Sequence, residues 1–587
     1  MSVGAGRIVG VQVAVARDED GDGGQLVPLQ PDGRPAGPAE RVSDLATAVA
    51  ARERADRPRW VWASTGAIYP GLLRRGCRVE RCHDVELTEA LLLGQDGRWG
   101  EPRGLGAAWA RLTGAPVPAD PPPRAAAPPG DGQTALFDVA PGPHPLGLHA
   151  LVRVYADQQR RTAATAQPGR FRLLVAAESA GALIAAEMTA TGLPWRADVH
   201  DALLVELLGE PSPVGGPPRR LAELSARIAA AFGVRHLHAE SPAELLRAFA
   251  RAGHDLPSTR AWVLRGIDHP AVPLVLEFKE LYRIWTAHGW TWRDAWVRDG
   301  RFRPEYVPGG VVSGRWATRG GGALQIPKVV RRAVLADPGW RFVVADAGQL
   351  EPRVLAAVSG DARLAAAGGA GDLYAALARE SFGGDRARAK LALLGAMYGQ
   401  TGGSAIPALA VLRRSYPTAF EYVEAAARTG EGGGLVRSWL GRTCPPASVA
   451  LRESEEGEGT VVEAGGLDPF GPRARAAARA RGRFTRNFVI QATAAEWALT
   501  LLAGLRNGLA RLGDDSAAGA GSGQEGRAEL VFFQHDEVLV HCPAGQADRV
   551  TALVQEAAAQ AGRLLFGATP VRFPLDISVV TCYADAA

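Results

Sequence analysis

The chain has 587 residues, too many for a single hydrophobic core, so we expect about two to four domains. Hydrophobic residues make up 47% and charged residues 22%, as in globular proteins, and a net charge of +4 says little about nucleic acid. The sequence has no long uninterrupted apolar run and no signal-peptide pattern, so we expect neither a membrane span nor secretion.

Cysteines and lysines are both sparse. The five cysteines form no Cys-x-x-Cys pair, which favours neither a zinc site nor a disulfide framework and indicates a reducing, cytoplasmic setting. Of 66 lysine and arginine residues only three are lysines, namely Lys279, Lys328 and Lys390. A lysine kept in such a chain is a candidate for a site that needs a compact ammonium group.

The N-terminal part has the pattern of a small α/β unit. Residues 7–16 carry valine at alternate positions, as in a half-buried strand, and residues 67–93 predict a helix, a strand over 77–81 and a second helix. Residues 114–147 are rich in proline and have no period, which predicts a linker or a long surface loop.

Helical patterns dominate the middle of the chain. Residues 241–253 combine an N-cap serine, a proline at the first helical position and a terminal glycine. Residues 366–482 are helical with glycine-rich breaks, and the acidic run at 453–459 predicts an exposed loop. A further loop is predicted at 514–526, ahead of a strong strand signal.

Four polar residues interrupt an apolar pattern in VVADAGQLEPRVLAAVSGD, residues 343–361. Asp346 follows a run of small apolar residues, and Gln349, Glu351 and Arg353 then occupy alternate positions. A strand that delivers an acid to an active site produces this pattern, and so does a strand that runs out into solvent. The segment alone does not decide between them.

A second segment, residues 386–399, reads RARAKLALLGAMYG. Arg386, Lys390 and Leu394 recur at every fourth position and follow one ridge of a helix, with Tyr398 at its flank. A guanidinium and an ammonium one turn apart can hold the phosphates of a nucleotide. A surface helix with two basic side chains gives the same spacing.

A third segment, LVFFQHDEVLVHC at residues 530–542, has two apolar strand patterns around His535, Asp536 and Glu537. A hairpin with acids at its tip can bind a metal ion, although an aspartate at a turn needs no function. Asp346 and Asp536 each follow an apolar strand, and two such carboxylates can share two Mg²⁺ ions. Together the three segments indicate nucleotidyl transfer from a nucleoside triphosphate.

The three segments resemble, in order and spacing, motifs A, B and C of family A DNA polymerases, the bacterial DNA polymerase I group. The first looks like D-Y-S-Q-I-E-L-R-V-L-A-x-x-S-G-D, the second like R-x-x-x-K-x-x-x-F-G-x-x-Y-G, and the third contains H-D-E. Residues 313–327 are similar to the family's T-G-R-L-S-S…L-Q-N-I-P, and residues 483–498 to its R-x-x-x-N-x-P-I-Q-G-T-A-A-D. The resemblance covers roughly residues 170–587.

The resemblance implies an α/β multidomain protein with a right-hand architecture of palm, fingers and thumb, preceded by an RNase H-like exonuclease-type α/β domain. The implied boundaries are residues 1–160 for the exonuclease-like domain, 161–310 for the thumb and the start of the palm, 311–365 for the palm with motif A, 366–482 for the fingers with motif B, and 483–587 for the palm with motif C. The implied partners are primer–template DNA and dNTPs, for a monomer without membrane association in the cytoplasm, at the nucleoid.

The family's functional positions carry over residue by residue. Asp346 and Asp536 would be catalytic ligands of two Mg²⁺ ions, with Glu537 as an auxiliary acid. Arg386 and Lys390 would bind the triphosphate, and Lys390 would also be catalytic.

Further positions would contact the nucleotide sugar, the bases or the duplex. Leu394 would lie against the incoming sugar, Tyr398 near the templating base, and Glu351 would act as a steric gate against a ribose 2′-hydroxyl. Contacts to the primer–template, or to the minor groove around the new base pair, would come from Gln349 (which would also serve the nucleotide), Arg315, Asn487, Gln491 and His535.

The chain departs from the family pattern at several positions. Ala347 and Gly348 replace Tyr-Ser, Leu394 replaces an aromatic residue, and Ala492 replaces a glycine. The family's D-I-H becomes Asp-Leu-Tyr at residues 372–374, which removes a phosphate-binding histidine. We expect activity, because the metal acids and the lysine are present, and the departures bear on selectivity and speed.

The N-terminal unit resembles the family's 3′–5′ proofreading exonuclease, in which acids from three motifs act through two metals. Residues 7–21 look like the strand after the one with the first D-x-E pair, so that pair is expected to be missing, and no 5′-nuclease domain is expected. Pro70 stands where the second motif has a metal aspartate. Asp84 looks like a structural acid and Asp157 at most like one remaining ligand, so we predict no proofreading.

Two alternatives stay open. An RNA-synthesising relative, like the single-subunit phage RNA polymerases, shares the palm, although a carboxylate at Glu351 resembles the DNA-selective gate. A non-catalytic primer–template DNA-binding protein could keep the fold, although Asp346, Asp536 and Lys390 argue against it.

Overall fold

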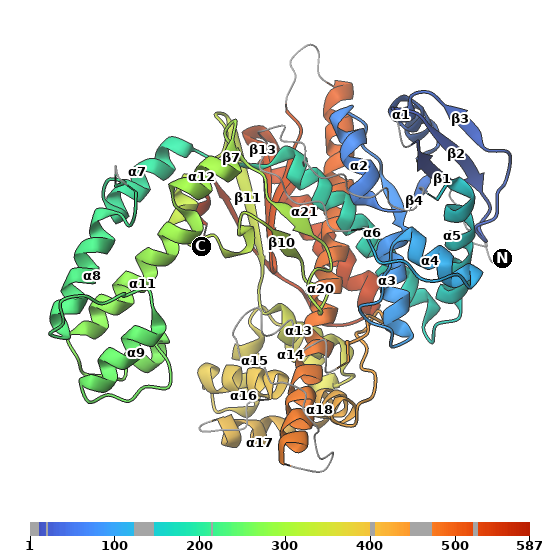
Figure 1. Cartoon of the computed structure of the whole chain (residues 1–587). Helices are drawn as coiled ribbons and strands as arrows, with labels where there is room; N and C mark the ends of the chain where they lie inside the picture. The colour runs from blue at the N-terminus through green and yellow to red at the C-terminus, as the bar shows by residue number, and fades with distance from the viewer. Residues whose placement is uncertain are drawn as a thin grey trace.

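The structure is a computed structural model, and it places three parts around a central sheet (Figure 1). It describes residues 11–18, 21–121, 146–212, 215–399, 405–446, 472–519 and 526–586. In the view of Figure 1 a helical arm, the thumb, lies to the left, helical fingers lie below, and the N-terminal unit lies to the right.

A mixed five-stranded sheet, in the order β3-β2-β1-β4-β5, forms the N-terminal unit. β1 (Gln12–Arg17) is central, antiparallel to β2 (Gly24–Leu29) and parallel to β4 (Arg59–Trp62). The predicted strand is confirmed but is not half-buried, because Val13 and Val15 are buried in one apolar cluster and Ala14 in another on the opposite face. The remaining elements are β3 (Glu40–Val42), β5 (Arg81–Asp84), α1 (Leu45–Asp56), α2 (Thr65–Arg74), α3 (Val85–Gln95), α4 (Leu105–Thr113) and α5 (Leu148–Ala163).

Two local predictions for this unit meet different outcomes. The strand predicted at residues 77–81 is wrong in position, because pairing of Trp60 with Cys82 places β5 at 81–84. Most of the proline-rich stretch, residues 122–145, lies outside the described residues. Its flanks agree with a break in structure, since α4 ends at Gly114 with a φ of 73°.

The long helix α6 (Pro168–Thr191) packs against both the N-terminal unit and the palm, and leads into the thumb. In the thumb, the predicted cap at Ser241 is confirmed, since its side chain accepts a hydrogen bond from the Glu244 N–H. The thumb helices are α7 (Ala197–Leu208), α8 (Arg219–Ala231), α9 (Pro242–Arg251), α10 (Ala261–Leu264), α11 (Ala271–His288) and α12 (Trp290–Trp296). Short strands at its base are β6 (Leu193–Pro194), β7 (Val297–Arg298), β8 (Arg301–Phe302), β9 (Glu305–Val307) and β10 (Ala317–Arg319).

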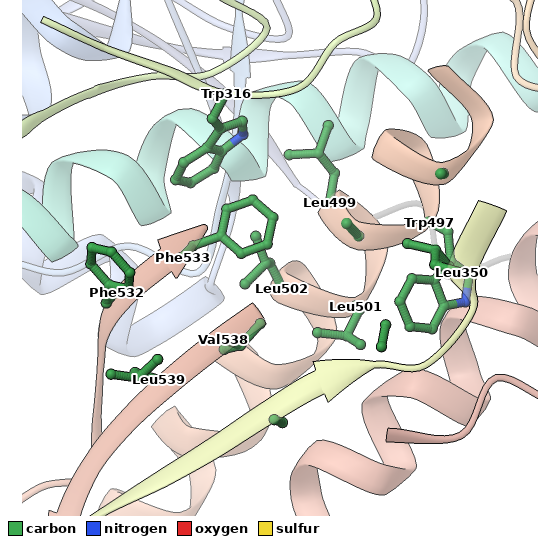
Figure 2. Close-up of a cluster of buried hydrophobic side chains, with 14 of the residues drawn as sticks. Trp316, Leu350, Trp497, Leu499, Leu501, Leu502, Phe532, Phe533, Val538 and Leu539 are labelled. Atoms are coloured by element: carbon green, nitrogen blue, oxygen red, sulfur yellow. The ribbon is translucent and has the colours of Figure 1, made fainter. Parts of the chain in front are cut away.

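The palm is an antiparallel sheet in the order β12-β13-β11-β14. Its strands are β12 (Glu529–Gln534), β13 (Glu537–Pro543), β11 (Trp340–Ala347) and β14 (Leu575–Val580). The helices α20 (Pro472–Gly519) and α21 (Ala547–Phe566) pack against each other and against the sheet. Figure 2 shows the resulting core, in which Trp497 and Leu501 of α20 lie near Phe533 and Val538 of the hairpin.

The fingers follow the palm strand β11. The strand is followed first by α13 (Leu350–Val358) and α14 (Ala362–Gly368), and the fingers comprise α15 (Leu373–Ser381), α16 (Arg386–Tyr398), α17 (Ala405–Ser415) and α18 (Pro417–Glu431), with part of α20. The loop predicted at 514–526 is wrong over its first part, because α20 continues to Gly519 through alanines that favour helix. The acidic run at 453–459 lies outside the described residues.

Within the described ranges two helices would be long and apolar enough to span a membrane by length and composition alone, namely α6 and residues 475–513 of α20. Within those apolar windows, 61% of the residues in α6 and 83% in α20 are buried inside the protein. Packing against neighbouring elements therefore accounts for their apolar character.

Candidate active site

Two separate strands bring the predicted metal acids together at one end of the palm sheet. Asp346, near the end of β11, pairs across the sheet with Glu537 of β13 on one side and with Asp576 of β14 on the other. Asp536 lies in the turn between β12 and β13, and its carbonyl accepts a hydrogen bond of 3.2 Å from the N–H of Ala347. The predicted convergence of the two strands is therefore present.

These carboxylates repel one another in a partly buried setting. Burial, and then the charges of Glu537 and Asp576, raise the pKa of Asp346. Burial, and then the charge of Asp346, raise the pKa of Asp536 to about 6. Such a cluster is stabilised by a bound cation, which removes the repulsion.

The two carboxylates fit Mg²⁺ better than a metal ion whose ligands all come from the protein. No group of three or more His, Cys, Asp or Glu side chains in the described ranges is arranged around a single metal position. Mg²⁺ commonly takes one or two carboxylates and completes its shell with water and substrate phosphates. Asp346 and Asp536 are donors of that kind.

Both chain reversals beside the acids hold a non-glycine residue in the left-handed region. Gln349, at the N-terminus of α13, and His535, in the hairpin turn, each have a φ of 58°. Such values are uncommon for residues with a side chain and concentrate at functional sites. His535 is exposed, so its predicted contact with DNA is sterically possible.

Glu537 has protein partners of its own. The Tyr583 hydroxyl donates a hydrogen bond to its carboxylate, and Arg331 Nη1 lies 3.5 Å from Glu537 Oε1. The Arg331 guanidinium also lies over the Tyr583 ring, 4.2 Å from its centroid. Both contacts are made to Oε1, and the role of Glu537 as an auxiliary acid stays a prediction.

A cluster of four predicted site residues lies next to the acids. Arg315 Nη2 is 2.5 Å from Glu351 Oε1, and the Tyr398 hydroxyl donates a hydrogen bond of 2.6 Å to Glu351 Oε2. Burial and the bond to Glu351 raise the pKa of Tyr398 to about 12, and Gln491 also bonds its hydroxyl. Glu351 is thus held rigidly, as a steric gate requires.

The remaining duplex-contact candidate is Asn487, on α20. It is half-buried, and its side-chain oxygen finds no hydrogen-bond partner among the residues that the structure describes. A buried polar atom without a partner is costly, which suits a residue that completes its bonds with a ligand.

The predicted basic helix is confirmed as α16, which Asp385 caps by accepting a hydrogen bond from the Arg388 N–H. Arg386 and Lys390 are both exposed, and no ion pair to Lys390 forms within the described part of the chain. Leu394 is half-buried against the core. Of the two predicted phosphate ligands, Arg386 is therefore paired with Asp372 and Lys390 is unpaired, and Arg388 of the same helix is exposed as well.

Sequence reasoning missed three partners of the predicted residues. Asp576 stands beside Asp346, Tyr583 and Arg331 engage Glu537, and all three come from segments that carry no recognised motif. The only sequence signal for Asp576 is that it is a charged residue within a strand pattern. That Asp346 lies opposite it follows from the register of the two strands, which the sequence pattern does not show.

In the N-terminal unit the candidate nuclease acids have structural partners. Asp84 is buried, accepts hydrogen bonds from the N–H groups of Thr65 and Leu87, and caps α3, as expected of a structural acid. Pro70 lies inside α2. Asp157 forms ion pairs with two arginines of its own helix.

An antiparallel sheet with acids at one end, set between a helical thumb and helical fingers, defines the right-hand polymerase class. A solved structure with this fold is the POL domain of Pol1 from M. smegmatis in complex with DNA primer-template and dNTP. It superposes with a TM-score of 0.68 at 17% identity, covering 98% of this chain and 96% of that one.

Residues 218–583 match the sequence model of DNA polymerase family A. The chain therefore belongs to DNA polymerase family A. It is 28% identical over 345 residues to the thermostable DNA polymerase I of Thermus filiformis, covering 54% of this chain and 36% of the relative. For DNA polymerase I of Chloroflexus aurantiacus the values are 28% over 285 residues, 44% and 27%. The matched region spans about a third of the length of these relatives.

Proposed function

We propose that the protein is a template-directed DNA polymerase that adds dNMPs to a primer 3′ end by two-metal nucleotidyl transfer, in DNA repair or replication. The observation that carries this proposal is the convergence of Asp346 and Asp536 at one end of the palm sheet. Members of the family generally use divalent metal ions. The chemistry of the two carboxylates fits that use.

Each residue of the site has a defined task in this proposal. Asp346 and Asp536 would hold two Mg²⁺ ions, which lower the pKa of the primer hydroxyl and neutralise charge on the reacting phosphate. Arg386 and Lys390 bind the triphosphate, the first through a planar fork and the second through a point charge. Glu351, fixed by Arg315 and Tyr398, excludes a ribose 2′-hydroxyl.

The proposal includes primer–template DNA and dNTPs as partners. Support comes from the fold shared with the M. smegmatis polymerase domain, which was solved with both. Arg315, Gln491, Asn487 and His535 supply the contacts to the duplex, and Gln349 contributes from the start of α13. A monomer in the cytoplasm, at the nucleoid and without membrane association, belongs to the same proposal.

Absence of proofreading is also proposed. The central strand β1, with the sequence QVAVAR, carries no acid, Pro70 occupies the second motif, and Asp84 serves as a helix cap. Two-metal hydrolysis needs several carboxylates that face one position. The described residues of the N-terminal unit offer no such group.

Extension of a labelled primer–template with Mg²⁺ tests the function. Wild type is expected to add dNTPs in template order, and Asp536→Ala is expected to lose extension while it still binds the duplex. Asp548→Asn is the matched control, because Asp548 is an exposed acid of the palm, at the start of α21. A wild type that binds the duplex and extends nothing would support the binding-protein alternative instead.

Two further arms of the same experiment address selectivity and proofreading. Wild type is expected to discriminate against rNTPs, and Glu351→Ala is expected to accept them, because the gate is removed. Equal use of rNTPs by wild type would favour the RNA-synthesising alternative. Without nucleotides the primer should keep its length, and its shortening by wild type would contradict the absence of proofreading.

A further inference from the structure

The Arg386 guanidinium rests on a neighbouring acid of the fingers. Arg386 Nε donates a hydrogen bond of 2.8 Å to Asp372 Oδ2, and its Cζ atom lies 5.6 Å from the centre of the Tyr374 ring. The terminal nitrogens of Arg386 make no hydrogen bond to described residues. The contact with Asp372 therefore uses Nε of Arg386 and leaves Nη1 and Nη2 available to a ligand.

Asp372 itself is fixed from two directions. Its other oxygen, Oδ1, accepts hydrogen bonds from the Ala375 N–H at 3.1 Å and from the Gln349 amide at 2.9 Å. The Gln349 side-chain oxygen in turn accepts a hydrogen bond of 2.9 Å from the Leu373 N–H. These hydrogen bonds fix the orientation of the Asp372 carboxylate, so the carboxylate cannot easily rotate.

Stability does not explain the ion pair between these two residues. The Arg386 side chain is 53% exposed and that of Asp372 is 39% exposed. Ion pairs this exposed typically contribute little to the free energy of folding. An oriented arginine whose outer nitrogens stay available is instead the geometry that bidentate phosphate binding requires.

We propose that Asp372, held by Gln349, is a positioning residue that orients Arg386 to grip the triphosphate of the incoming nucleotide. This inference rests on the proposed polymerase function. It gives Gln349 a task within the protein, in addition to the contact with nucleotide or DNA that its motif implies. Tyr374, which stands where the family has a phosphate-binding histidine, then serves as the apolar support beneath the guanidinium.

Two aspartate-to-asparagine substitutions distinguish the orientation of Arg386 from the general effect of removing a negative charge in the fingers. Asp372→Asn keeps Oδ1, and with it the helix cap and the bond from Gln349, but places an amide group where Arg386 now finds an acceptor. Asp385→Asn is the matched control. Asp385 caps the helix that carries Arg386, accepts a hydrogen bond of 2.9 Å from the Arg388 N–H, and precedes Arg386 by one position.

Single-nucleotide incorporation and calorimetric binding of inorganic triphosphate are the measurements. Asp372→Asn is expected to raise the KM for dNTP and the Kd for inorganic triphosphate about tenfold, with kcat within about twofold of wild type. Asp385→Asn should change each value less than about twofold, although it too removes an N-cap carboxylate, that of α16, as Asp372→Asn removes that of α15. In an Arg386→Ala background, Asp372→Asn should add less than about twofold, because the residue that it orients is gone.

Three results would overturn the inference. An unchanged KM in Asp372→Asn means that Arg386 needs no orientation, and a lowered KM means that Asp372 restrains it. An undiminished effect in the Arg386→Ala background means that Asp372 acts on the structure of the fingers and not through Arg386. A wild type that binds inorganic triphosphate as expected but extends no primer would contradict the proposed polymerase function. The orientation of Arg386 by Asp372 would still be tested by the Kd of the variants for inorganic triphosphate.

Discussion

At the scale of single residues, Asp536 is a carboxylate whose surroundings disfavour its ionised form. A free aspartate has a pKa of about 3.9, whereas burial and the neighbouring charge of Asp346 raise the pKa of Asp536 to about 6 in the folded protein. Between these values the folded chain binds more protons than the unfolded chain, so stability falls as pH rises. A pKa raised by burial and a neighbouring charge makes such a residue a candidate functional position.

We expect Asp536→Asn to be more stable than wild type at pH 7.5 in EDTA, by about 1–2 kcal/mol, because the variant has no charge to bury. The difference should shrink as pH falls through about 6 and vanish near pH 4, where wild type is protonated. Thermal unfolding at several pH values measures this, with Asp548→Asn as control. A difference that is independent of pH would contradict the assignment.

At the scale of elements, the C-terminal turn supports the hairpin that carries Asp536. The 3₁₀ turn Tyr583–Asp585 is packed so that the Tyr583 ring is fully buried and its hydroxyl bonds Glu537, the first residue of β13. Arg331 joins the two side chains from a separate segment. The position of the metal acid thus depends on a contact with the last turn of the described chain.

We expect Tyr583→Phe to lose about 1 kcal/mol of stability, because a hydrogen bond to a partly buried, charged group is removed. Primer extension should slow severalfold, with duplex binding unchanged, since the turn at Asp536 loses support. Thermal unfolding and single-turnover kinetics measure the two effects. Tyr282→Phe is the control, as the Tyr282 hydroxyl makes no hydrogen bond to the residues that the structure describes. Equal behaviour of the two variants would argue against support through Glu537.

At the scale of the whole molecule, a buried polar network attaches the N-terminal unit to the palm. Arg506 of α20 forms an ion pair of 2.6 Å with Glu187 of α6, and its Nη1 donates to the carbonyl of Glu80 at 2.7 Å. The Tyr69 hydroxyl of α2 bonds the same Glu187 carboxylate at 2.5 Å. Three parts of the chain therefore share one carboxylate.

We expect Arg506→Met to destabilise the protein by about 3–5 kcal/mol, because it leaves Glu187 buried without its cation. The double variant Arg506→Met/Glu187→Gln should recover part of this loss, since no buried charge then remains. Thermal unfolding and limited proteolysis between the two parts measure the effect. Arg428→Met, which breaks an exposed ion pair with Glu421, should cost less than about 1 kcal/mol. If the double variant recovered no stability, the loss in Arg506→Met would come from lost packing between the N-terminal unit and the palm, and not from the unpaired charge of Glu187.

Local patterns in the sequence determined much of the site. The apolar run before Asp346, the two strands around residues 534–537 and the ridge of α16 are each set by neighbouring residues, and all three elements form as predicted. The boundary of β5 and the C-terminal part of α20 were less predictable. The first depends on pairing with another strand, and the second on a helix that continues through a stretch rich in small residues.

Only the tertiary structure decided which side chains meet. That Asp576 stands beside Asp346, that Tyr583 binds Glu537, and that Asp372 orients Arg386 follows from strand register and from the packing of segments far apart in the chain. Periodicity reports which face of an element is buried, whereas the partner across that face depends on the free energy of the whole fold. The sequence by itself therefore determined the family, the elements and the acids, and the fold determined the contacts that hold those acids and the cations in place.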